Sequence, residues 1–288
     1  MTGNQREQVK RIAAYQRAKQ EFAWSIVFRG VALVLGVMGT WLFPKFLYTP
    51  IILVVLVVAA EYLSYLSDTT KGQAEQFARA TDYHDSLGWA IKEPQRLAAA
   101  TLTSAKKRAE VAKKRGDTVY FESKAPVGAL RGVQNTKQSA WYTAQQAEGL
   151  KKLMWVLVYL TGLSAVGYFL LALLPLVGTV VPDRAAALGG VVKTSSALAT
   201  AALSLGLVRL AIGYGRASQG ATRAYEQALD YEKRGDELTE QDAIYLLATY
   251  HLTRASMPVI PEWWWDHHAK RLNELWDQEV SEQSAAAS

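Results

Sequence analysis

The sequence contains no cysteine, and it has few of the patterns that mark strands or catalytic sites. Without cysteine the protein can form neither disulfide bonds nor thiolate metal sites. The chain also lacks a glycine-rich loop for phosphates and a nucleophile elbow, and His251, His267 and His268 lack metal-ligand spacing with carboxylates. We therefore expect no catalytic residue, no cofactor and no metal site, and we do not interpret the chain as an enzyme.

The most prominent feature that the sequence does have is a set of long uncharged runs. Residues 153–182 carry no charge over a length that exceeds the roughly 20 apolar residues a helix needs to cross a bilayer. Residues 23–43 are apolar except for Arg29, residues 49–66 are apolar except for Glu61, and together they predict a transmembrane hairpin. A shorter run, 194–208, makes a fourth span if flanking basic side chains reach the headgroups. We expect an all-α integral membrane protein with four transmembrane helices and a helical cytoplasmic domain.

Four crossings place both ends of the chain and its middle region on the same side of the membrane. The segment before residue 23 holds five basic and two acidic residues, so the positive-inside rule puts that side in the cytoplasm. The predicted order is a cytoplasmic N-terminal helix (1–22), a transmembrane hairpin (23–67), a basic cytoplasmic sensor region (68–152), a second transmembrane hairpin (153–214) and an acidic cytoplasmic helical tail (215–288).

The two large hydrophilic regions differ in charge. Residues 68–152 contain 15 Lys or Arg against 9 Asp or Glu, a net charge of +6, whereas residues 215–288 contain 7 against 13, a net charge of −6. These regions could dock on each other, within or between subunits, or they could present two ordinary solvated surfaces.

Apolar spacing in these regions predicts helices rather than strands. The expected helices are 68–90, 93–114, 136 into the third span, 216–234, 239–256 and 262–280, with a strand-like stretch at 118–121 and a loop at 124–135. In the helix over 239–256, Thr239 is the expected N-cap. One mixed face of that helix carries Ile244, Leu247, Tyr250, His251 and Arg254.

The predicted spans contain ionisable residues. Arg29, Glu61 and Arg209 lie at similar depth, roughly 8–9 Å inside the cytoplasmic boundary at a rise of about 1.5 Å per residue. Ionisable groups at that depth are costly unless they pair or face water, so we predict that Glu61 pairs with Arg29 or Arg209, either as a static bridge or as part of a gate or conduit. The fourth run carries small hydroxyl residues at every fourth position, Ser196, Thr200 and Ser204. This stripe either allows close helix packing or wets a pore between subunits.

The sensor region contains two basic clusters seven residues apart, here called the basic stripe: Lys106, Lys107, Arg108, Lys113, Lys114 and Arg115. A seven-residue interval returns to nearly the same helix face, so the stripe is about 10 Å long. Three aromatic residues and one basic residue complete the candidate ligand site: Tyr120, Phe121, Trp141 and Arg131. Basic groups hold phosphates and aromatic rings stack bases, which suits a nucleotide or single-stranded nucleic acid as ligand. A solvated helix and an anionic lipid site are the alternatives.

Two segments and the overall layout carry a resemblance. VYFESKAPVGALRGVQNTKQSAWYT (119–143), YHLTRASMPVIPEWWW (250–265) and the order of two spans, a long insert, two spans and a helical tail are similar to the four-transmembrane effectors associated with SMODS-type nucleotidyltransferases in bacterial antiphage systems. The chain also resembles SLATT-type effectors and the Hailong effector. The resemblance covers nearly the whole chain, but its segments are not catalytic signatures and match no ligand residue one by one.

The resemblance implies a nucleotide-regulated effector that oligomerises in the bacterial inner (plasma) membrane and disrupts it, so that an infected cell stops growing or dies. A cyclic oligonucleotide opens such effectors in CBASS-like systems, whereas a DNA oligomer keeps Hailong-like effectors closed, so the sign of control stays open. We expect a homo-oligomer, with a tetramer as the working assembly. Its expected partners are the lipid bilayer, a cyclic nucleotide or single-stranded oligonucleotide, and a functionally linked nucleotidyltransferase.

The function predicted from the sequence is therefore a ligand-gated, pore-forming ion-channel effector of antiviral defence. The alternative is a non-conducting membrane scaffold that recruits a cytoplasmic partner through its acidic tail. A membrane-embedded lipid enzyme is a third possibility, which the missing catalytic residues disfavour.

Overall fold

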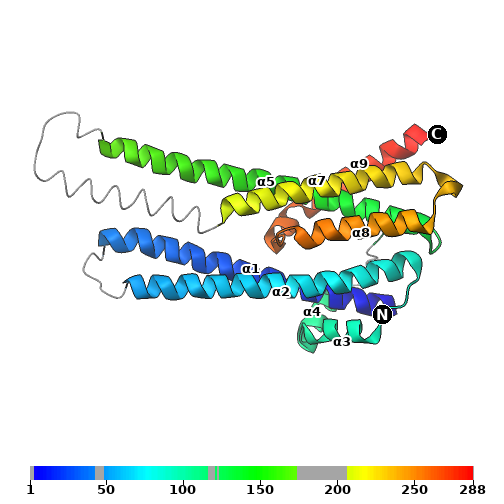
Figure 1. Cartoon of the computed structure of the whole chain (residues 1–288), viewed down its shortest axis with the longest axis horizontal. Helices are drawn as coiled ribbons and strands as arrows, with labels where there is room; N and C mark the ends of the chain where they lie inside the picture. The colour runs from blue at the N-terminus through cyan, green and yellow to red at the C-terminus, as the bar shows by residue number, and fades with distance from the viewer. Residues whose placement is uncertain (1–2, 43–48, 116–120, 122, 174–205, 288) are drawn as a thin grey trace, which may run out of the picture. The chain divides into compact units, whose positions relative to one another are not determined.

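The computed structural model describes residues 3–42, 49–115, 121, 123–173 and 206–287, and the regular structure within these residues is helical (Figure 1). The elements are α1 (Gly3–Leu42), α2 (Thr49–Leu87), α3 (Glu93–Thr101), α4 (Ala105–Arg115), α5 (Ala129–Leu173), α7 (Leu207–Glu232), the 3-10 turn η2 (Gly235–Glu237), α8 (Glu240–Ser256) and α9 (Glu262–Ala287). The all-α prediction is confirmed for this part of the chain.

The chain divides into two compact units. Unit 1 comprises Met1–Gln20, Ser67–Gly149 and Gly213–Ser288, and unit 2 comprises Glu21–Leu66 and Leu150–Ile212. Each of the four boundaries falls inside a helix, namely α1, α2, α5 and α7. Each unit is thus assembled from segments that are far apart in the sequence.

The core of unit 1 forms where α5, α7 and α8 pack together. Its buried side chains combine small and large residues: Val133, Ala140, Ala224, Ala228, Tyr231, Ala243, Leu246 and Tyr250. Gly213 on α7 lies so close to Pro258 that an added Cβ would be 2.6 Å from the proline Cγ. A second cluster joins α5 to α9 through Trp141, Leu272 and Trp276. Small residues at these contacts allow the helix backbones to approach closely.

Helix α8 begins where the sequence predicts. Thr239 Oγ1 accepts a hydrogen bond from Asp242 N at 3.2 Å, and Asp242 Oδ2 accepts one from Thr239 N at 3.1 Å, which completes a capping box. The mixed face is also confirmed, because Ile244 is partly buried and Leu247, Tyr250, His251 and Arg254 are buried.

The single helix predicted over 93–114 is wrong, because the segment folds as α3 and α4. Ser104 lies between them and its Oγ accepts a hydrogen bond from Lys107 N at 3.2 Å. The Arg108 guanidinium donates to the carbonyl oxygens of Ala100, at 2.7 Å, and Thr103. These contacts satisfy backbone groups at the break, which contains neither glycine nor proline and so gave no turn signal.

The loop predicted over 124–135 is wrong in its second half. Helix α5 begins at Ala129, directly after Gly128, whose φ of 151° glycine adopts at little cost. Val133 is completely buried in the core of unit 1, and this burial outweighs the turn-like composition of the stretch. The predicted strand-like stretch lies outside the described residues except for Phe121.

Among the described helices, α2 is long and apolar enough to cross a membrane by length and composition, over Ile51–Leu87. Only 11% of its most apolar stretch is buried, whereas the core helix of a soluble protein is mostly covered. One such helix indicates membrane association but defines no topology. The other three predicted spans stay predictions, and residues 174–205, which hold parts of the third and fourth, lie outside the described residues.

Candidate functional site

Unit 1 contains charged and titratable side chains that are buried together. They are Arg11 from α1, Lys71, Glu75 and Asp82 from α2, and His251 and Arg254 from α8, and each is at most 8% exposed. We call these six residues the buried charge cluster. Burying a charge is costly unless it is paired, so the contacts within the cluster decide what it can do.

Asp82 is the centre of the buried charge cluster. The Arg11 guanidinium donates to both carboxylate oxygens, with Nη2 3.4 Å from Oδ2. Arg254 Nη1 lies 3.6 Å from the same Oδ2, while its Nη2 lies 3.3 Å from Glu75 Oε1 and donates to the Tyr15 hydroxyl at 2.5 Å. Two guanidinium groups and two carboxylates therefore balance one another inside unit 1.

Lys71 connects α2 to the end of α8. Its Nζ donates to the backbone carbonyl oxygens of Arg254 at 2.9 Å, Ala255 at 3.0 Å and Met257. The last carbonyls of a helix have no partner within the helix, and a cation there also interacts favourably with the helix dipole. Burial lowers the pKa of Lys71, with Glu75 acting in the opposite direction.

His251 is the neutral member of the cluster. Burial, and next the positive charge of Arg254, lower its pKa from 6.5 to about 3. Its Nε2 lies 3.4 Å from Asp82 Oδ2, but neither ring nitrogen makes a hydrogen bond. At physiological pH this approach is therefore a contact between a neutral ring and a carboxylate rather than an ion pair.

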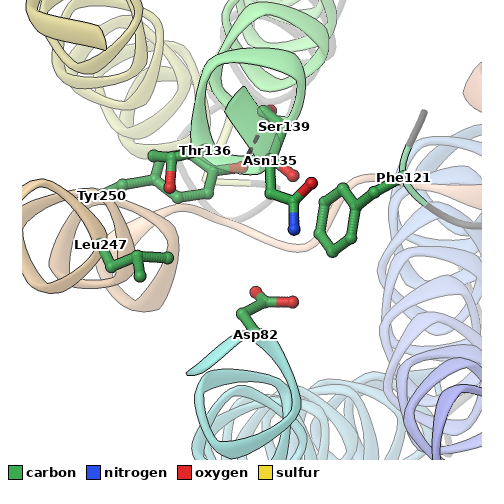
Figure 2. Close-up of a pocket in the computed structure, with 7 residues that line it drawn as sticks. All are labelled: Asp82, Phe121, Asn135, Thr136, Ser139, Leu247 and Tyr250. Carbon is green, nitrogen blue, oxygen red and sulfur yellow. Dashed lines mark hydrogen bonds between the residues drawn. The ribbon is translucent and has the colours of Figure 1, made fainter. Parts of the chain in front are cut away.

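A narrow crevice lies beside Asp82, as Figure 2 shows. It is lined by Asp82, Phe121, Asn135, Thr136, Ser139, Leu247 and Tyr250. The space among these side chains is too narrow to hold a water molecule. Asn135 Nδ2 donates to Ser86 Oγ at 3.2 Å, whereas the buried Asn135 Oδ1 has no partner. The crevice is filled by closely packed polar and apolar side chains.

The histidines and carboxylates of the described residues form no group of three that could hold a metal ion. His84 Nδ1 is 2.8 Å from the Trp89 carbonyl oxygen. His268 Nδ1 is 2.9 Å from the Trp264 carbonyl oxygen, and the two rings stack with centroids 4.0 Å apart. These rings are positioned by local contacts.

In unit 2, an ion pair joins α1 to α2. Arg29 Nη2 donates to Glu61 Oε1 at 2.8 Å, which confirms the predicted pairing of Glu61 with Arg29. The two side chains differ in exposure, at 14% for Arg29 and 65% for Glu61. Arg209 lies exposed on α7. The predicted pore residues Ser196, Thr200 and Ser204 lie outside the described residues.

Large apolar side chains are exposed along the helices of unit 2. Those more than half exposed include Trp24 and Val34 on α1, Ile51, Val54, Val55 and Val58 on α2, and Val156, Leu160 and Leu163 on α5. Among the described residues of this unit, Ser25 is the one buried polar side chain, and its Oγ donates to the Phe22 carbonyl oxygen at 2.7 Å. Unit 2 is apolar on its surface, whereas unit 1 buries charges.

The basic stripe lies on α4. Lys106, Lys113 and Lys114 are exposed, and Arg115 is the last residue of the helix. Lys107 Nζ lies 3.3 Å from Glu110, and Lys114 Nζ lies 3.6 Å from Glu262. Arg108 is engaged by the backbone carbonyls between α3 and α4. Three lysines of the predicted ligand site are thus accessible to solvent, whereas Arg108 stabilises the connection between α3 and α4.

The aromatic residues of the predicted ligand site are covered. Phe121 and Trp141 are 8% and 6% exposed, and the Trp141 ring packs against Trp276 at a centroid distance of 5.3 Å. A base could stack on Trp141 only if this aromatic cluster opened. Arg131 is partly buried and its Nε has no hydrogen-bond partner, and Tyr120 lies outside the described residues. The structure does not present these residues and the basic stripe as one open face.

Sequence reasoning missed the buried charge cluster. Lys71, Glu75 and Asp82 are spaced at i, i+4 and i+11 and share one face of α2, where Ala74 and Ala78 are also buried. The signal in the sequence was the placement of Ala74 and Ala78 beside these charged residues, because small residues beside charges on one helix face indicate a packed surface. Comparisons of the chain with protein-family models, curated proteins and solved structures found no match.

Proposed function

We propose that this protein is a homo-oligomeric, pore-forming membrane effector that is regulated by a nucleotide or oligonucleotide. The observation that carries the proposal is the surface of unit 2, where exposed apolar side chains precede and follow Arg29 on α1 and Glu61 on α2. Monomeric soluble proteins rarely expose large contiguous apolar patches. A bilayer would cover this surface, and the four predicted spans would place unit 2 within it.

The ion pair supports a conducting function more than a purely anchoring one. Ionisable residues inside a membrane are costly and usually mark an ion pathway or a polar contact between helices. An anchor needs neither Arg29 nor Glu61. We therefore assign the ion pair to the conduit of an assembled pore, and we adopt a tetramer as the working assembly.

The sensing function is assigned to unit 1 and to the exposed lysines of α4. Lys106, Lys113 and Lys114 offer phosphate-binding charge on one short helix. The resemblance to SMODS-associated and Hailong-like effectors supports an oligonucleotide as the ligand and antiphage defence as the context. Under this proposal both termini and the middle region are cytoplasmic, and the pore kills or arrests an infected cell by disrupting its inner membrane.

Ion flux from liposomes tests the proposal. Purified full-length protein is reconstituted and K⁺ release is measured without ligand, with a cyclic trinucleotide and with a short single-stranded DNA oligomer. We expect one of these nucleotides to change the flux. Flux that never occurs, under any of these conditions, would contradict the pore.

A matched set of variants tests the assignment of the ligand surface. Replacing Lys106, Lys113 and Lys114 together by Gln should lower nucleotide affinity and weaken its dependence on salt, because three phosphate contacts are lost. The control removes the same number of charges elsewhere in unit 1, by replacing the exposed residues Lys233, Lys270 and Arg271 with Gln. Equal affinities in the two sets would show that α4 is not the ligand surface.

The second candidate function is a non-conducting scaffold. The exposed carboxylates of α9, Glu274, Asp277 and Glu282, favour it because they offer a charged surface to a cytoplasmic partner. A protein that inserts into liposomes but releases no K⁺ with either nucleotide would favour the scaffold over the pore.

A further inference from the structure

Glu61 is an exposed carboxylate on an otherwise apolar stretch of α2. Its side chain is 65% exposed, although its partner Arg29 is 14% exposed at a distance of 2.8 Å. The guanidinium is therefore held within the protomer while the carboxylate projects from it. The residues one and two turns before Glu61 on the same face, Val54, Val57 and Val58, are exposed and apolar.

This exposure is costly if the face of α2 meets lipid. A charged group in hydrocarbon has to reach the headgroups, pair or meet water, and only long basic side chains reach far. Arg29 covers only part of Glu61, because most of the Glu61 side-chain surface remains exposed. The exposed part of the Glu61 side chain therefore has to contact water or another protein surface.

We infer that Glu61 faces a water-filled lumen shared by several copies of this chain, and that the lumen selects cations. The inference rests on the proposed pore and adds the identity of the permeant ions. In a ring of identical subunits the Glu61 carboxylates surround one axis, and acidic rings of this kind attract cations and repel anions. The residues that line the lumen below the ring are then Val54, Val57 and Val58.

Arg29 has a defined task in this arrangement. Carboxylates brought together in a ring repel one another. The positive charge of the Arg29 guanidinium, 2.8 Å from Glu61 Oε1, reduces this repulsion. A Cβ added at Gly206 would lie 3.9 Å from Arg29 Nη1, so the start of α7 is also near this guanidinium.

Single cysteines test whether this face of α2 meets water. The chain has no cysteine of its own, so each introduced thiol reports alone. Only a thiolate in contact with water reacts with a charged, membrane-impermeant reagent. Val54→Cys shares the Glu61 face and leaves the ion pair intact, whereas Val55→Cys is equally exposed in the protomer, at 61%, but lies about a third of a turn away. We expect labelling of the liposome-reconstituted protein to be at least about tenfold faster at 54 than at 55, the rate ratio that a 1.4 kcal/mol difference in accessibility gives.

The reversal potential in a KCl gradient tests selectivity. Wild type and Glu61→Asp should prefer K⁺ over Cl⁻, Glu61→Gln should lose most of that preference, and Asp68→Asn should keep it. Asp68 is the matched control because it removes the same charge from nearly the same face of α2, seven residues further on and in unit 1.

The outcomes separate the inference from the proposal on which it rests. If the protein conducts but Glu61→Gln keeps wild-type selectivity and positions 54 and 55 label equally, the lumen assignment is overturned and the pore stands. If the protein never conducts, the pore itself fails. Loss of selectivity together with faster labelling at 54 supports the inference.

Discussion

Replacing Asp82 by Asn gives the sharpest test of the buried charge cluster. The side chains of Asp82 and Arg11 are 4% and 1% exposed, so water cannot take over when the carboxylate is neutralised. Asn has nearly the same volume, and therefore no cavity contributes to the effect. The change removes the charge that pairs with Arg11 and that also lies 3.6 Å from Arg254.

The magnitude follows from leaving a buried guanidinium without its counter-charge. Removing one partner of a buried ion pair costs about 3–5 kcal/mol in the free energy of unfolding. For a unit of this size, that loss corresponds to a fall of roughly 6–20 °C in Tm. The control is Asp230→Asn, since its pair with Lys233 is 72% and 77% exposed and contributes at most about 0.5 kcal/mol.

Thermal unfolding of the full chain in detergent, followed by near-ultraviolet circular dichroism, measures the difference. Trp141 and Trp276 lie in the core of unit 1 and report its tertiary packing. The double variant Arg11→Met with Asp82→Leu should be less destabilised than the sum of its single variants by about 1–3 kcal/mol. A Tm for Asp82→Asn close to that of Asp230→Asn would refute the reasoning.

Two further predictions concern unit 1. In the folded state the pKa of His251 is lowered to about 3, whereas in the unfolded chain this histidine binds a proton near pH 6.5. The free energy of unfolding should therefore fall by on the order of 1.5 kcal/mol as the pH is lowered from about 6.5 to 5. Unfolding measured at several pH values should show a smaller pH dependence in His251→Gln than in the wild type, whereas the control His267→Gln, at an exposed histidine, should match the wild type. The same pH dependence in the wild type and both variants would contradict a neutral His251 ring. Gly213→Ala should lower the free energy of unfolding by about 1–3 kcal/mol, because the new Cβ would lie 2.6 Å from the rigid Pro258 ring. Gly72→Ala on α2 should raise it by about 0.5–1 kcal/mol, because the new Cβ would have no neighbour within 4 Å. Denaturant unfolding measures both changes. Similar stability changes at the two glycines would contradict the close contact.

The features that could be predicted from the sequence are those that depend on local periodicity. The N-cap Thr239 and the buried face with Tyr250 and Arg254 follow from the 3.6-residue repeat and capping chemistry. The Arg29–Glu61 pair followed from the cost of isolated charges in apolar segments. These inferences needed no knowledge of which distant helices meet.

The features that sequence reasoning missed depend on long-range packing. Arg11 and Asp82 are 71 residues apart, and each lies in a polar stretch that also suits a solvated helix. Phe121 and Trp141 were interpreted as stacking platforms, but the same aromatic character suits a protein core, and only the fold shows that they are covered. Local pattern specifies which face of a helix is packed, whereas the identity of its partner depends on the whole chain.

The discontinuous build of unit 1 has a consequence for biosynthesis. The ribosome makes Arg11 and Asp82 early, but His251 and Arg254 emerge only after both apolar segments of unit 2. Until α8 is synthesised, Glu75 lacks its guanidinium and Lys71 lacks the carbonyls that it caps. Nascent chains arrested before α8 should therefore remain sensitive to protease in their N-terminal segments.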